Sequence, residues 1–162
     1  MTRHLNRHAA AAGFTLIELA VVVAIVAVVS TVAAPSFKVF LDSMNAKSAA
    51  MDLVGDLTTA RSEALKRNAA VSIVPVDNDW ANGWQILRGD TPLREHPALR
   101  SGISVTAPAA GVSFLPNGRV SDTELSTGNS TWAIRSSVAG VQPRCVLITP
   151  SGAARAKQGS CT

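Results

Sequence analysis

A long apolar run without charge, residues 19–37, constrains this chain more than any other feature of its sequence. Its length is close to the minimum that crosses a bilayer as a helix. Basic residues precede the run, and one carboxylate, Glu18, stands at its start. An ordinary secretory signal also has basic residues before an apolar core, but it gains nothing from an acidic side chain, which costs about 3 kcal/mol inside a membrane. We therefore expect residues 14–37 to form a membrane-inserted helix.

Glu18 requires compensation, because charges inside a membrane are usually paired. The nearest possible amine is an α-amino group four residues earlier, on Phe14. That group exists only if the chain is cut between Gly13 and Phe14. We expect Glu18 to pair with the freed N-terminus of a neighbouring subunit and so to set the register of helices that pack side by side.

These residues resemble the N-terminal signal of type IV pilins and pseudopilins. The match comprises a basic leader, the segment Gly-Phe-Thr-Leu-Ile-Glu at 13–18, an apolar run and Pro35. The resemblance implies that a prepilin peptidase removes the leader, residues 1–13, by cutting after Gly13, and methylates Phe14. It also implies that the glutamate assists assembly into a filament. The alternative is an ordinary signal anchor that carries this glutamate by chance.

Beyond Pro35 the helical pattern continues and becomes amphipathic over residues 38–68. Apolar residues recur at intervals of three, four or seven, which predicts a single apolar stripe. The stripe comprises Phe37, Leu41, Met44, Met51, Val54, Leu57, Ala60 and Ala64. Asp56 and Glu63 fall mostly off it. We expect one helix over residues 14–67, kinked at the proline.

Residues 69–162 predict a β-rich globular domain, because short extended runs alternate with turn residues. Strands are expected at 71–76, 84–88, 103–106, 112–115, 131–135, 144–149 and 153–157. Pro75 indicates that the first strand lies at an edge or ends early, and residues 77–83 read as a turn. The fold class is α+β: a long N-terminal helix, with a transmembrane half and an amphipathic half, packed on an antiparallel β-sheet, as in the pilin fold.

Several segments of this domain resemble the GspH/FimT branch of the pseudopilins. They are ARSEALKRN at 60–68, DWANGWQIL at 79–87, FLPNGRV at 114–120, and SGAARAK at 151–157 between two cysteines. The last of these resembles the end of FimT-like and FimU-like minor pilins. The order of the segments along the chain fits this branch.

The sequence contains no catalytic constellation, and we expect neither an enzyme nor a cofactor. After removal of the leader, His96 is the single histidine, so no Ser–His–Asp set can be proposed. The acidic run at 77–79 invites a calcium interpretation, but it lacks the spacing and the distal glutamate of an EF-hand. A hairpin turn is the simpler interpretation, and we expect no metal site.

Two cysteines, Cys145 and Cys161, lie near the C-terminus. Outside the cytosol they favour a disulfide, whose loop would contribute about 3 kcal/mol; a shared metal is the competing interpretation. Between them lie Arg155 and Lys157, with no carboxylate after Glu124. The pair resembles the C-terminal Gly-Arg-x-Arg motif with which FimT-like minor pilins contact double-stranded DNA, although here it stands two residues later and ends in lysine. An ordinary solvated hairpin is the alternative.

We therefore expect a minor pilin that primes or caps a type IV pilus, with DNA binding for uptake as a compatible further role. The alternative is a GspH-like minor pseudopilin of a type II secretion system. The resemblance implies a single-pass protein of the inner membrane with a periplasmic C-terminal domain, later part of a filament. The implied partners are the prepilin peptidase, other minor and major pilins, membrane lipid and double-stranded DNA.

Overall fold

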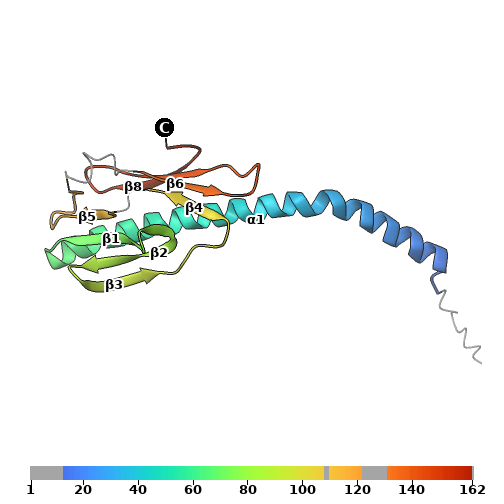
Figure 1. Cartoon of the computed structure of the whole chain (residues 1–162), viewed down its shortest axis with the longest axis horizontal. Helices are drawn as coiled ribbons and strands as arrows, with labels where there is room; N and C mark the ends of the chain where they lie inside the picture. The colour runs from blue at the N-terminus through green and yellow to red at the C-terminus, as the bar shows by residue number, and fades with distance from the viewer. Residues whose placement is uncertain (1–12, 108–109, 122–130, 162) are drawn as a thin grey trace, which may run out of the picture. The chain divides into compact units, whose positions relative to one another are not determined.

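The computed structural model describes residues 13–107, 110–121 and 131–161 (Figure 1). Nearly all of the expected leader, residues 1–12, lies outside the described residues. The helix α1 spans Leu16–Arg67 and contains Pro35. The chain divides between Phe37 and Lys38 into two compact units, so α1 begins in the first unit and ends in the second.

Asn68 ends α1 in a left-handed conformation, with φ of 47°. The Asn68 N–H donates to the Leu65 carbonyl at 3.4 Å, and the Ala69 N–H donates to the Ala64 carbonyl at 3.3 Å. This pair of bonds is a Schellman motif, in which asparagine takes the place usually filled by glycine. The chain then enters the first strand directly.

The described residues of the second unit form two four-stranded antiparallel sheets with the strand orders β3-β2-β1-β5 and β4-β6-β7-β8. The first sheet contains β1 (Val71–Val76), β2 (Asp79–Arg88), β3 (Thr91–His96) and β5 (Val112–Phe114). The second contains β4 (Ile103–Thr106), β6 (Thr131–Ser136), β7 (Arg144–Ile148) and β8 (Ala154–Gln158). The expected α+β class is confirmed, with two sheets where one was expected.

β3 is the strand that the sequence did not reveal. Its residues, TPLREH, do not alternate between apolar and polar, and most of its side chains are exposed. It lies at the edge of the first sheet, and β2 is its one partner among the described strands. A strand with only two partly buried side chains, Leu93 and His96, three residues apart, leaves no alternating signal.

The turn expected at 77–83 is shorter in the structure. Asp77 and Asn78 alone form it, both with positive φ, and Asp79 already pairs with Val76. Two residues with positive φ match the twist that a tight β-hairpin requires. The expectation for Pro75 holds only in part: β1 lies inside the sheet and continues past the proline, but β5 pairs with it no further than Ile73.

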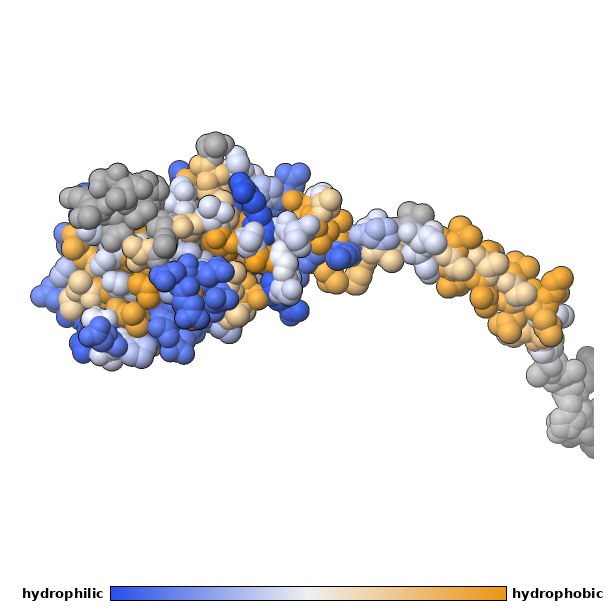
Figure 2. Space-filling view, viewed as in Figure 1, coloured by the Kyte–Doolittle hydropathy of each residue, from blue (hydrophilic) through white to orange (hydrophobic). Residues whose placement is uncertain are grey.

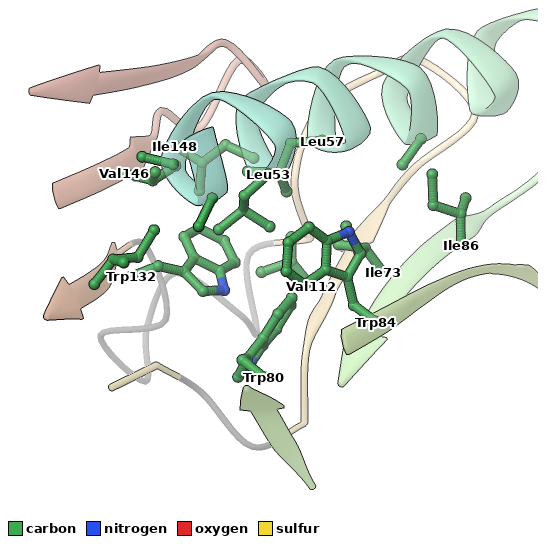
Figure 3. Packing of buried hydrophobic residues seen from close by; sticks show 14 of the residues in the cluster. Leu53, Leu57, Ile73, Trp80, Trp84, Ile86, Val112, Trp132, Val146 and Ile148 are labelled. Carbon is green, nitrogen blue, oxygen red and sulfur yellow. The ribbon is translucent and has the colours of Figure 1, made fainter. Parts of the chain in front are cut away.

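The core of the second unit lies between α1 and the inner faces of the two sheets. Figure 3 shows Trp80, Trp84 and Trp132 gathered next to Leu53 and Leu57 of α1. The ring centroid of Trp80 lies 6.1 Å from that of Trp84 and 5.5 Å from that of Trp132. The rings of Trp80 and Trp132 meet edge to face. Such pairs add about 1 kcal/mol each beyond the burial of their apolar area.

The helix face that fills this core differs from the expected stripe. The core-facing residues of α1 are Ala46, Ala49, Ala50, Leu53, Leu57, Ala60 and Ala64. Met44 and Met51 are 49% and 57% exposed, and Asp56, expected off the stripe, is buried. The small alanines let the sheets approach the helix, whereas the long methionines lie on its other side.

Candidate functional site

The N-terminus of α1 is closed by two reciprocal hydrogen bonds between Thr15 and Glu18. The Thr15 backbone N–H donates to Glu18 Oε2 at 3.4 Å, and the Glu18 backbone N–H donates to Thr15 Oγ1 at 3.2 Å. This arrangement is a capping box. A carboxylate in the first turn also interacts favourably with the helix dipole. Glu18 thus has a partner within its own chain, beside the one expected in another subunit, and the Thr-x-x-Glu pattern is the sequence signal for it.

Gly13 and Phe14 precede the helix and belong to no regular element. Phe14 is 89% exposed, and a Cβ added to Gly13 would meet no atom within 4 Å. The peptide bond between them is therefore open to another molecule. A cut at this bond would preserve both hydrogen bonds of the capping box, because neither involves Phe14 or an earlier residue.

The helix after the capping box exposes a continuous apolar surface (Figure 2). Its exposed large side chains are Leu16, Ile17, Leu19, Val21, Val22, Val23, Ile25, Val26, Val28 and Val29. Within the described residues no single helix meets the length and hydropathy needed to cross a membrane. Two consecutive helical segments, Leu16–Thr31 and Ala33–Arg67, are together long and apolar enough to cross a membrane, by length and composition alone. The helix bends between them.

The cysteines of the second unit form the predicted disulfide. Cys145 on β7 is joined to Cys161, which follows β8, with a Cα–Cα distance of 5.2 Å. The Gly159 N–H also donates to the Pro143 carbonyl at 2.9 Å. Together these contacts tie the end of the chain to the β7–β8 hairpin. No group of three or more metal-ligating side chains occurs in the described residues.

Arg155 and Lys157 lie on one face of β8, two residues apart. They pair across the sheet with Leu147 and Cys145, which alternate with the core residue Val146 of β7. Both basic residues therefore belong to the face of the second sheet that points away from the core, and both are exposed. The strands of this sheet contain four basic residues and no carboxylate.

A buried carboxylate joins α1 to the first sheet. Asp56 is 2% exposed; its Oδ2 accepts the Trp84 Nε1–H at 2.9 Å, and its Oδ1 lies 3.1 Å from Arg94 Nε. The His96 ring stacks on Trp84 at 3.9 Å, and its Nε2 lies 3.9 Å from Asp52 Oδ2. Sequence reasoning missed this cluster, because Arg94 and His96 come from the unrecognised strand β3.

Glu63, near the end of α1, is paired with two basic side chains of the same helix. The Arg67 guanidinium donates a hydrogen bond to it at 2.7 Å and lowers the pKa of the Glu63 carboxyl, with a smaller contribution from Lys66. Both partners follow Glu63 by one helical turn. This pairing supports the last turn of the helix.

A capped apolar helix that continues into a β-rich, disulfide-closed domain is the architecture of the type IV pilin-like proteins. Comparisons with known proteins agree. The family model described as type II transport protein GspH matches residues 49–152, more than half of the chain. The model of the prokaryotic N-terminal methylation motif matches residues 9–34. The chain belongs to the GspH family.

Among solved structures, the chain is similar to the type IV minor pilin FimU of Pseudomonas aeruginosa (strain PAO1), with 27% identity and a TM-score of 0.56. That match covers 75% of this chain and 92% of FimU. A second crystal form of FimU matches with 28% identity and a TM-score of 0.53, over 70% and 92% of the two chains. The minor pseudopilin EpsH of the type 2 secretion system of Vibrio cholerae shares the fold, with 16% identity, a TM-score of 0.52, and coverage of 70% and 97%. No curated protein sequence matches the chain significantly.

The protein is thus a minor pilin or pseudopilin, of a type IV pilus or of a type II secretion system. The methylation motif implies processing by a prepilin peptidase and assembly with other pilins. The family implies anchoring in the inner membrane and incorporation into a filament. Its relatives are structural subunits, which is the role that we infer here.

Proposed function

We propose that this protein is a minor pilin that primes or caps a type IV pilus. The observation that carries this choice is the likeness to FimU, which reaches 27% identity over 92% of that chain, whereas EpsH shares 16%. The alternative, a pseudopilin of a type II secretion system, is favoured by the description of the matching family model. Deletion of the gene separates the two: a pilus subunit affects the number of surface pili, and a secretion subunit affects the export of secreted enzymes.

We propose further that the peptide bond after Gly13 is the processing site and that Glu18 acts in assembly. Mass spectrometry of the mature chain should find an N-terminal methylated Phe14. In the resulting subunit, residues 14–37 anchor in the inner membrane and residues 38–162 lie in the periplasm. The disulfide fits an oxidising compartment. A mature chain that retains the leader or begins elsewhere would contradict this assignment.

Two substitutions separate the assembly role of Glu18 from its role in the capping box. Glu18→Gln keeps an oxygen that can accept the Thr15 N–H but loses the charge needed to pair with an amine. Thr15→Ala keeps the charge and removes one of the two capping hydrogen bonds. We expect normal processing in both variants and loss of filament incorporation in Glu18→Gln only. Equal incorporation of both variants would refute pairing with an amine.

We also propose that Arg155 and Lys157 contact the phosphates of double-stranded DNA. Their exposure on one face of a carboxylate-free sheet supports this proposal. Each phosphate contact that is lost should reduce the slope of log affinity against log salt by about 1. The double variant Arg155→Ala/Lys157→Ala should therefore lower the slope by about 2.

The matched control for this measurement is Arg88→Ala/Arg100→Ala, which removes two exposed basic residues outside the second sheet. Duplex binding by the full chain in detergent, measured at several salt concentrations, distinguishes the two pairs. An equal loss in both double variants would indicate an effect of net charge alone. No change in the first variant would remove the proposed site.

A further inference from the structure

The strand β8 is the last strand of the second sheet, and no described strand pairs with its outer edge. Hydrogen bonds at both ends of the β7–β8 hairpin show which way its backbone groups point. The Gly159 N–H donates to the Pro143 carbonyl, and the Thr149 N–H donates to the Ala153 carbonyl. In an antiparallel pair of strands, hydrogen-bonded and non-hydrogen-bonded residue pairs alternate. Arg155, which pairs with Leu147, lies two residues after Ala153 and therefore also belongs to a hydrogen-bonded pair.

The same alternation turns the backbone groups of Ala154, Ala156 and Gln158 toward the free edge. Two of these three residues are alanines, so little side-chain bulk obstructs an approaching strand. Ala156 and Gln158 are exposed. The edge therefore offers a short row of backbone donors and acceptors, which is the surface that an added β-strand uses.

A groove beside this edge separates β8 from α1 and is basic. Ala156 and Gln158 line one side, and Lys47 and Met51 of α1 line the other. Arg144 of β7 and Lys157 of β8 also line the groove, and among the described residues no carboxylate does. The Met51 side chain, 57% exposed, gives the groove an apolar wall.

Arg144 is only partly satisfied by the residues around it. One terminal nitrogen donates to Gln158 Oε1 at 3.4 Å, but its Nε is shielded from solvent and has no hydrogen-bond partner within the described residues. A buried donor without an acceptor is unfavourable, because it has given up its hydrogen bond to water and gained none in return. A carboxylate that entered the groove could accept from this group, and Lys47 would add a second positive charge.

We propose that the outer edge of β8 binds an extended acidic segment of another polypeptide, which adds to the second sheet as a further strand. The backbone of the segment would pair with Ala154, Ala156 and Gln158. Its carboxylates, at every second position, would face Arg144 and Lys47. The outer face of β8, on which Arg155 lies, is separate from this edge, whereas Lys157 borders both.

The test uses the full chain in detergent and a fluorescent peptide in which glutamate alternates with valine. Ala156→Pro removes one outward N–H without removing a bond between β7 and β8, and should weaken binding at least about tenfold. Arg144→Gln with Lys47→Gln should weaken it by a similar factor. The matched charge control is Arg88→Gln with Arg100→Gln, two exposed residues outside the second sheet, which should bind as the parent does.

The peptide itself supplies a control that does not depend on folding of a variant. N-methylation of the peptide at every second residue removes the backbone N–H groups that would pair with β8 and should abolish binding. Replacing its glutamates with lysines should also abolish binding, because the lysines would be repelled by the basic groove. Amide hydrogen exchange at Ala156 and Gln158 should slow when the parent peptide is bound. Unchanged affinity of the N-methylated peptide or of Ala156→Pro would overturn the proposal. Equal protection of the same amides by a DNA oligonucleotide would assign the groove to phosphate instead.

Discussion

The buried contact between Asp56 and Trp84 should contribute measurably to the stability of the second unit. Asp56→Ala leaves the Trp84 Nε1–H without its acceptor at a position that is 1% exposed, which costs about 1–3 kcal/mol. The lost ion pair with Arg94 adds under about 1 kcal/mol, since the Arg94 side chain is 57% exposed. We expect a total loss of about 1–4 kcal/mol in the free energy of unfolding.

Urea unfolding of the full chain in detergent, followed by tryptophan fluorescence, measures this loss. Asp52→Ala is the matched control, because Asp52 is half exposed and lies 3.9 Å from its histidine partner; it should change stability by less than about 0.5 kcal/mol. A double-mutant cycle with Trp84→Phe isolates the hydrogen bond, because phenylalanine has no N–H to leave unsatisfied. We expect a coupling energy of at least about 1 kcal/mol between Asp56→Ala and Trp84→Phe. Strictly additive losses would refute the assignment of the cost to this hydrogen bond.

Three further substitutions probe other parts of the fold. Cys145→Ser removes the disulfide and should lower stability by about 3 kcal/mol, measured by urea unfolding with and without reductant; the reductant should change nothing in the variant. Gly152→Ala should cost about 1–3 kcal/mol, because Gly152 has φ of 81° and its new Cβ would collide with the Gly118 carbonyl. Gly159→Ala is the control for the collision, because Gly159 also has a positive φ, 103°, but open space around it; it should cost less. The lowered pKa of Glu63 means that its pairing with Arg67 stabilises the folded state above the unfolded pKa and is lost as pH falls through the folded pKa. Amide protection in the last turn of α1, measured relative to the intrinsic exchange rate at each pH, should fall over that acidic range, and Glu63→Gln should remove this change in protection.

Much of this architecture was predictable, since local chemistry determines it. Alternation and turn residues located most of the strands, and the paired cysteines predicted the disulfide. The apolar stripe of α1 was harder to assign. Asp56 lies seven residues after Ala49 and three after Leu53, so it shares the buried face, but its polarity placed it outside the stripe. A buried polar residue is recognisable only once its partner is known, and Trp84 reaches it from a separate strand.

The candidate sites show the same dependence on distance along the chain. The capping box lies within four consecutive residues and can be recognised in the sequence as Thr-x-x-Glu. The basic groove combines α1 with β7 and β8, which are separated by about a hundred residues of sequence. No local pattern could bring Lys47 and Arg144 together. That β8 lies at an edge of the second sheet is likewise a matter of strand order, which short-range patterns do not give.

The capping box and the proposed pairing between subunits place compatible demands on Glu18. Its carboxylate has two oxygens; Oε2 accepts the Thr15 N–H, and within the described residues Oε1 accepts no hydrogen bond. The cap therefore orients the side chain and leaves one oxygen for the amine of a neighbouring Phe14. Ordering a free glutamate costs up to about 2 kcal/mol of side-chain entropy. The cap orders the Glu18 side chain before two subunits come together, so part of this entropy is already lost at that point. Thr15→Ala should therefore slow incorporation into the filament without preventing it. Loss of the Glu18 charge should prevent incorporation.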